Sequence, residues 1–140
     1  MIKFNYTTGF VLQNEKSINK LMFFLSSKED VTISKLLYHF VSKTKITEIN
    51  KTHLSHNYST DVITFDYSDG NTIIAEAFIC PEEVLSNAEH FSQIAEDETV
   101  RVLVHAVLHL CGYDDKTKAG AAEMRTKEDF YINEYHTCFK

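Results

Sequence analysis

The sequence is poor in the residues that break a chain or crosslink it. Its 140 residues include only four glycines and one proline, which disfavours collagen-like, repetitive and disordered chains. The three cysteines, Cys80, Cys111 and Cys138, are odd in number, widely spaced and form no CxxC motif. This usage argues against a disulfide framework and for reduced cysteines, so we expect a cytoplasmic protein.

Long apolar runs and an excess of basic residues are also missing. No apolar stretch approaches the ~20 residues of a membrane helix, and residues 1–20 contain no basic segment that leads into an apolar one. We therefore expect neither membrane insertion nor export. The net charge is −6, so a diffuse positive field cannot bind nucleic acid. Any RNA partner would need a local basic patch or a metal ion.

The residues that are present predict one folded domain over residues 1–140. Hydrophobic residues make up 44% of the chain and charged residues 24%, as in ordinary globular domains. A chain of this length can bury a core that needs no disulfide or metal to hold it. No linker divides the sequence.

Hydrophobic periodicity predicts a mixture of strands and helices. Strands are expected at residues 2–6 and 34–42, and the turn signal "SDGN" predicts a hairpin of residues 60–67 and 72–79. Helices are expected at residues 15–26, 44–54, 81–92, 97–110 and 117–135. This order favours an α+β fold in which a small mixed β-sheet packs against helices. The helix of 97–110 is apolar on most sides, so we expect it to be central, buried and in contact with the hairpin.

The stretch "VHAVLHLCGYDD", from Val104 to Asp115, carries the strongest chemical signal. On a helix, His105 and His109 lie on one face about 6 Å apart, which lets both imidazoles reach one cation. Gly112 can adopt a positive φ and turn the chain so that Asp115 returns toward the histidines. Three protein ligands with an open fourth position are typical of catalytic zinc. We therefore predict that His105, His109 and Asp115 bind one zinc ion.

Two neighbouring residues bear on the alternatives. A zinc peptidase with an HExxH motif uses its glutamate as a general base, and Ala106 occupies that position here. A peptidase is therefore disfavoured but stays an alternative. Cys111 follows His109 by two residues and faces another direction on a helix, so it is a weaker candidate ligand. The alternative to a metal site is that His105 and His109 are two histidines packed in the core without a ligand role.

The segment "HAVLHLCGYDD" resembles the HGxLHLxGYDH signature of the YbeY family of metal-dependent endoribonucleases, which are bacterial ribosomal RNA maturation factors. Asn50 and the segments "TDVITF", "AEAFIC" and "EMRTKEDF" resemble other family motifs, in order, over roughly residues 35–130. The resemblance implies an α+β fold, one zinc ion, and cleavage of single-stranded RNA in ribosomal RNA 3′ end processing and ribosome quality control. It also implies contact with the small ribosomal subunit, and with a ribosome-assembly GTPase or ribosomal proteins.

Three positions depart from the family pattern. The third histidine of the family corresponds to Asp115, which is a harder and anionic ligand, and the glycine after the first histidine corresponds to Ala106. The family's arginine upstream of its TDVLSF motif corresponds to Leu54, so a natural clamp for phosphate is missing. Either other residues bind RNA in its place, for which we predict Lys51, His53 and Arg101 with His56 as a further candidate, or the activity is weakened.

Several residues outside the metal motif are candidates for proton transfer. Asp61 precedes a predicted strand and Asp114 neighbours a predicted ligand, although turn hydrogen bonds or simple solvation would also explain them. His56, in "SHNYSTD", lies at a position that resembles the family pattern, near the expected active-site cleft. We predict catalytic roles for Asp61, Asp114 and His56. Glu76 is expected to orient the N–H of a ligating histidine, although it could simply be an exposed strand residue.

Three functions follow from these observations. The first is a metal-dependent hydrolase that spans residues 1–140 and acts as a zinc-dependent, single-strand-specific endoribonuclease. The second is a non-catalytic ribosome-assembly factor with a structural metal, which Leu54 and the acidic charge favour. The third is a zinc metallopeptidase, which Ala106 disfavours. Zinc removal separates the first two, because loss of a structural ion would unfold the domain.

Overall fold

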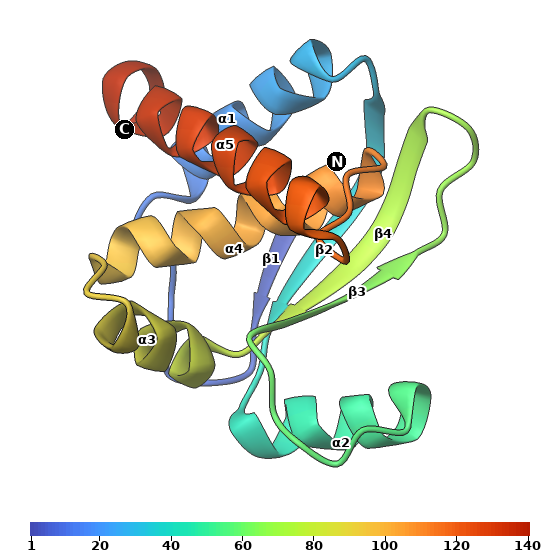
Figure 1. Cartoon of the computed structure of the whole chain (residues 1–140), viewed down its shortest axis with the longest axis vertical. Helices are drawn as coiled ribbons and strands as arrows, with labels where there is room; N and C mark the ends of the chain where they lie inside the picture. The colour runs from blue at the N-terminus through green and yellow to red at the C-terminus, as the bar shows by residue number, and fades with distance from the viewer.

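A four-stranded mixed sheet lies between helices in the computed structural model, which describes residues 1–140 (Figure 1). The strands are β1 (Ile2–Tyr6), β2 (Thr32–Phe40), β3 (Val62–Asp66) and β4 (Thr72–Ile79), and their order in the sheet is β1-β2-β4-β3. β1, β2 and β4 are parallel to one another, whereas β3 pairs with β4 as an antiparallel edge strand. The sheet confirms the predicted α+β class.

Five helices and a terminal π-helical turn complete the fold. The helices are α1 (Glu15–Lys28), α2 (Lys43–Leu54), α3 (Pro81–His90), α4 (Ala95–Leu110) and α5 (Lys118–Glu134), and the π-helical turn is Tyr135–Phe139. No predicted strand or helix differs from these bounds by more than two residues at either end. α4 begins before its expected start at Asp97, because its acidic residues occupy the first turn, where the helix dipole favours negative charge.

Local signals account for where the helices begin. The Ser42 hydroxyl accepts a hydrogen bond from the Lys45 N–H at 3.1 Å and caps α2, and the Thr117 hydroxyl accepts one from the Gly120 N–H at 2.9 Å and caps α5. Pro81 begins α3, where its missing N–H leaves no helical hydrogen bond unmade.

The main core lies between α4 and one face of the sheet. Leu103 and Val107 of α4 are fully buried with Ala75 and Ala77 of β4, as the expected contact between the helix and the hairpin requires. The Tyr38 hydroxyl of β2 donates a buried hydrogen bond to the Leu103 carbonyl at 2.9 Å. These contacts fix the position of α4 relative to the sheet.

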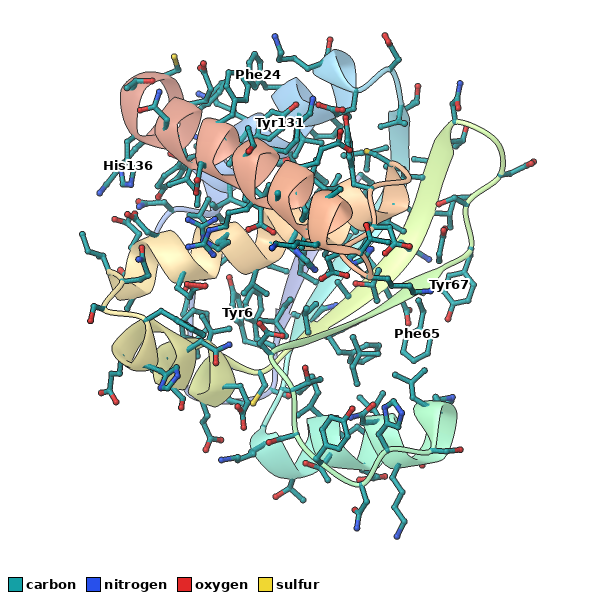
Figure 2. The ribbon with its side chains drawn as sticks, viewed as in Figure 1. Tyr6, Phe24, Phe65, Tyr67, Tyr131 and His136 are labelled. Carbon is teal, nitrogen blue, oxygen red and sulfur yellow. The ribbon has the colours of Figure 1, made fainter.

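The opposite face of the sheet is covered by α2 alone (Figure 1). Ile46 and Ile49 of α2 pack with Ile63 of β3 in a smaller cluster, and Phe65 packs against it. Figure 2 shows Phe65 pointing from β3 toward α2. The sheet therefore separates the smaller cluster on the α2 side from the main core on the α4 side.

Two expectations from the sequence concern disulfide bonds and membrane-spanning helices. All three cysteines are free thiols. A bilayer-spanning helix would need greater length and hydrophobicity than any helix here has.

Candidate metal centre

α4 and the turn after it bring the predicted metal ligands together. His105 and His109 project from the same side of α4, with their ring centroids 4.6 Å apart. Gly112 adopts a φ of 104°, and its N–H donates to the His109 carbonyl at 3.0 Å. The Tyr113 N–H donates to the Leu108 carbonyl at 3.1 Å and completes the turn. The chain therefore reverses as the glycine predicts, and Asp115 returns to the histidines.

The geometry of the three side chains fits a small cation. The His105 Nε2 lies 3.7 Å from the Asp115 Oδ2, and the His109 Nε2 lies 3.6 Å from the Asp115 Oδ1. One ligand atom from each of the three residues lies within 4.8 Å of the ligand atoms of the other two. Tetrahedral zinc with bonds near 2 Å would place its ligands roughly 3.3 Å apart, so only a small closure is required. Two imidazoles and a carboxylate form a donor set that zinc accepts.

Glu128 of α5 orients the first histidine from behind. Its Oε2 lies 2.6 Å from the His105 Nδ1, which leaves the His105 Nε2 to face Asp115. A carboxylate behind a ligating imidazole is the usual support of a zinc site. Burial opposes protonation of His105, but the hydrogen bond and charge of Glu128 outweigh it, so the pKa of His105 is raised. The position is electrostatically suited to a positive charge.

Arg101 is engaged in buried ion pairs on the same side of α4. Its Nη1 donates to the Glu128 Oε1 at 3.0 Å, and its Nη2 donates to the Asp129 Oδ1 at 2.8 Å. Its Nε lies 4.0 Å from the Glu98 Oε1 and has no hydrogen-bond partner. The guanidinium therefore holds Glu128 in place. Arg101 also lines a hollow beside the candidate ligands, so RNA binding by Arg101 stays a prediction, although its guanidinium is already paired with carboxylates of the protein.

Glu76 does not orient a histidine of the motif, so that prediction is wrong. It pairs across the sheet with Phe65, on the face that α2 covers. Its Oε1 lies 3.9 Å from the Nε2 of His39, a neighbour on the same face. Glu128 fills the role instead. The signal for it in the sequence was a glutamate in register with the apolar residues of the last helix, Met124 and Tyr131, both of which are buried.

Two hollows meet at the cluster of candidate ligands His105, His109 and Asp115, and both are lined by Asp61, Val62, His105 and Asp115. The first hollow has a volume of about 430 Å³, extends toward α3 and α5, and is lined also by Asn87, Phe91 and Arg125. The second has a volume of about 710 Å³, extends toward α2, and is lined also by Leu54, His56, Tyr58 and Lys116. Both volumes fall in the range of ~300–1,000 Å³ that is typical of ligand pockets.

Asp61 lies at the boundary between the two hollows. Burial raises the pKa of Asp61, and the nearby charge of His105 opposes that shift. The Asn87 Nδ2 donates to its Oδ2 at 3.3 Å, and the Thr60 hydroxyl lies 3.4 Å from its Oδ1. A carboxyl with a raised pKa beside a metal cluster is suited to carry a proton.

The other predicted site residues are divided between the second hollow and the surface. His56 lines the second hollow. Asp114 lines neither hollow, and its Oδ1 accepts a hydrogen bond from the Lys116 N–H at 2.6 Å, so it stabilises the turn. Lys51 and His53 also line neither hollow, and the His53 ring lies edge-on to Phe65 with centroids 5.2 Å apart.

Sequence reasoning missed two cations that line the hollows. Lys116 directly follows Asp115 and lines the second hollow, and Arg125 of α5 lines the first. The signal for Lys116 was its adjacency to a predicted ligand.

Cys111, the weaker candidate ligand, is outside the cluster, and burial raises the pKa of its thiol to about 11. A protonated thiol is a poor metal ligand.

Comparisons with known proteins agree with this architecture. A family model described as Endoribonuclease YbeY matches residues 5–136. The Endoribonuclease YbeY of Flavobacterium johnsoniae is 40% identical over 136 residues, which cover 97% of this chain and 98% of the relative. That of Karelsulcia muelleri is 40% identical over 132 residues, or 94% of each chain. The solution structure of TM1509 from Thermotoga maritima has a TM-score of 0.63 and 30% identity, and the match covers 96% of this chain and 89% of that one.

Proposed function

Because the chain belongs to the YbeY endoribonuclease family, we propose that it is a zinc-dependent endoribonuclease that cleaves single-stranded RNA. The observation that carries the proposal is the cluster of His105, His109 and Asp115 at the junction of two hollows. An extended strand can cross such a junction and place one phosphodiester at the cluster. The buried Glu128 behind His105 supports a metal rather than a pair of packing histidines.

Three side chains would hold the zinc ion: His105 and His109 through Nε2, and Asp115 through its carboxylate. A bound zinc ion stabilises the negative charge that develops on phosphodiester oxygens during cleavage. Three protein ligands are also the number that would be expected for a catalytic rather than a structural zinc site. Ala106, where a peptidase has its glutamate, is fully buried in the core and offers no base.

The chain's own residues supply orientation and proton transfer. Glu128 keeps the His105 Nδ1 hydrogen-bonded, so that the Nε2 faces the cluster. Asp61 can take or return a proton at its carboxyl group, because burial raises its pKa beside the cluster. His56 is a second candidate for proton transfer from the other hollow. Lys116 and Arg125, one in each hollow, are placed to neutralise phosphates that flank the cleaved bond.

The natural substrate proposed for this activity is ribosomal RNA of the small subunit, during 3′ end processing and ribosome quality control in the cytoplasm. Membership of a family named for endoribonuclease activity supports RNA as the substrate. Small-subunit proteins or an assembly GTPase would then deliver that RNA. An accumulation of unprocessed 3′ ends in cells that lack the protein would support the proposal, and mature ends in such cells would contradict it.

The deciding experiment combines metal analysis with RNA cleavage. Purified protein should contain one zinc ion and cleave a single-stranded oligoribonucleotide, and a chelator should abolish cleavage until zinc is restored. His109→Ala should lose zinc and activity, while His90→Ala, a histidine outside both hollows, should retain both. Cleavage that persists in the chelated protein would refute the proposal.

A non-catalytic assembly factor with a structural metal is the second candidate. It is favoured by Leu54, which lines the second hollow where an arginine would hold phosphate. Circular dichroism of the chelated protein separates the assembly factor from the nuclease, because the domain would unfold when a structural ion is removed. We expect the fold to persist, since the main core lies between α4 and the sheet and needs no metal.

A further inference from the structure

We propose that Phe91 and Tyr58 are two base-stacking platforms, which hold the nucleotides on either side of the cleaved phosphodiester and thereby select single-stranded RNA. The inference rests on the proposed endoribonuclease function and names how the same site would hold its substrate. Each platform lines one of the two hollows that meet at His105 and Asp115.

Phe91 is the platform of the first hollow. It follows the last residue of α3, and its N–H donates to the Asn87 carbonyl at 2.9 Å, which fixes its backbone. The side chain is exposed although it lines a concave surface. Exposed aromatic rings are not rare on this surface, but Phe91 is one that lines a hollow beside the cluster, and nucleic-acid bases stack well on such rings.

Tyr58 is the platform of the second hollow, and its ring is supported. It stacks on the His56 imidazole with centroids 5.2 Å apart and planes 14° apart, and its hydroxyl lies 3.1 Å from the His56 Nδ1. The buried Asn50 donates from its Nδ2 to the Tyr58 carbonyl at 2.9 Å and holds the loop. The outer side of Tyr58 is exposed and available to a base.

Charge in the first hollow favours a neutral base over a phosphate. Four carboxyl groups line it, from Asp61, Glu98, Asp115 and Glu128, against two guanidinium groups. One of these, on Arg101, is occupied by Glu128 and Asp129. Because Arg101 is occupied, Arg125 is the one guanidinium of this hollow left to neutralise a flanking phosphate. A second phosphate placed deeper, beside Glu98 and Glu128, would be disfavoured, whereas an uncharged base would not. The phosphodiester would therefore lie at the cluster, with its flanking bases in the hollows.

The arrangement would discriminate against duplex RNA. The first hollow extends from the cluster toward α3 and the second toward α2. These helices begin side by side, with the Lys43 Nζ 3.4 Å from the Glu83 Oε1, but they run in opposite directions, so their C-terminal ends lie apart (Figure 1). Two neighbouring bases can reach both platforms only if they unstack from each other and leave their pairing partners. A single strand permits this at low cost, whereas a duplex must first be opened.

Binding of a single strand to two ring-removal variants tests the platforms. Phe91→Ala and Tyr58→Ala should each weaken binding of a 2′-O-methyl single strand by about tenfold, which is within the range measured for one stacked base. The matched controls are Phe23→Ala and Tyr67→Ala, since these rings are 43% and 59% exposed, against 60% for Phe91 and 57% for Tyr58. Both controls lie outside the two hollows and should bind like the parent.

A spectroscopic probe distinguishes stacking from a general loss of structure. A 2-aminopurine base at the position that flanks the cleavage site should be quenched on binding to the parent. It should stay bright with Phe91→Ala and be quenched again with Phe91→Tyr. The same sequence as a duplex should bind weakly to the parent, and neither platform variant should change that affinity.

Three results would overturn the inference: platform variants that bind like the parent, controls that lose as much affinity, or a duplex that binds as tightly as the single strand. RNA cleavage is measured separately from RNA binding, so the endoribonuclease function and the stacking platforms can fail independently. Ring-dependent binding by a protein that cleaves no RNA would sustain the platforms and refute the nuclease. Chelator-sensitive cleavage with ring-independent binding would do the reverse.

Discussion

At the scale of single residues, Asp115 is where this chain departs most from the family signature. The family motif has histidine there, and the structure places the Asp115 carboxylate 3.6–3.7 Å from the Nε2 atoms of His105 and His109. A carboxylate adds a negative charge that a histidine would not, so it lowers the net charge of the occupied site. The position is well placed for substitution, because the side chain is largely exposed.

The first prediction compares two substitutions at this position. Asp115→His should retain zinc, because imidazole is an equally suitable ligand at this spacing. Asp115→Ala should lower zinc affinity by more than the roughly 10–100-fold typical of changes behind a ligand, because it removes a ligand itself. Elemental analysis of the purified variants is the measurement, and Asp69→Ala, an exposed aspartate in the hairpin turn, is the control that should keep its zinc. Full occupancy in Asp115→Ala would show that Asp115 is only a loop residue.

The second prediction concerns the missing phosphate clamp. Leu54→Arg places a guanidinium in the second hollow, and it should strengthen binding of single-stranded RNA. The dependence of log affinity on log salt concentration should steepen by about 0.7, the value for one added phosphate contact. Leu85→Arg is the matched control, because both leucines are 47% exposed and Leu85 lies outside both hollows. An equal gain from both variants would mean that only net charge matters.

At the scale of elements, the turn between α4 and α5 decides whether the site exists. It begins at Gly112 with its positive φ, and the Tyr113 hydroxyl donates to the Glu29 Oε1 at 2.6 Å. It ends where the Thr117 hydroxyl caps α5. Asp115 lies between these anchors, so its position depends on all of them.

The third prediction tests the close contact between this turn and α5. A methyl group on Gly120 would overlap the backbone carbonyl oxygen of Asp114, which is next to the ligand. Gly120→Ala should therefore shift the turn, lower the free energy of unfolding by about 1–3 kcal/mol and reduce zinc content. Gly9→Ala has open space around the new methyl group and serves as the control. Urea unfolding and elemental analysis measure the two effects, and a stable, zinc-replete Gly120→Ala would contradict the prediction.

At the scale of the whole molecule, Glu29 joins segments that are distant in the sequence. This buried carboxylate follows α1 and accepts hydrogen bonds from Tyr113 in the turn, and from Lys127 and Tyr131 of α5. Figure 2 shows Tyr131 where α5 passes α1. Burial opposes ionisation of Glu29, but these hydrogen bonds outweigh it, so its pKa is lowered. The turn that carries Asp115 is thereby coupled to the stability of the fold.

The fourth prediction gives the sign of this effect with pH. A carboxyl whose pKa is lowered by folding contributes stability that is fully present above its ordinary pKa of 4.5. That contribution is lost as the pH falls from 4.5 through the lower pKa of the folded state. Glu29→Gln should lower the free energy of unfolding by about 1–2 kcal/mol at neutral pH and by less in acid. Urea unfolding across this range is the measurement, and a pH-independent difference between the two proteins would refute it.

The sequence by itself determined the features that depend on residues close together in the chain. The spacing of His105 and His109, the turn at Gly112 and the return of Asp115 follow from the helical repeat and the freedom of glycine, which need no distant partner. The bounds of the strands and helices followed from periodicity for the same reason. The α+β class followed from the order of those elements.

Only the tertiary structure decided which distant side chains reach the metal cluster. Glu128 lies 23 residues after His105 in the sequence and contacts it only because α5 packs on α4. Alternation along β4 places Glu76 opposite Ala75 and Ala77, but only the packing shows that α4 covers the alanine face. The two hollows are likewise built by α2, α3 and α5, far apart in the chain. Local pattern fixes which way a side chain points on its own element, and packing alone fixes what it meets there.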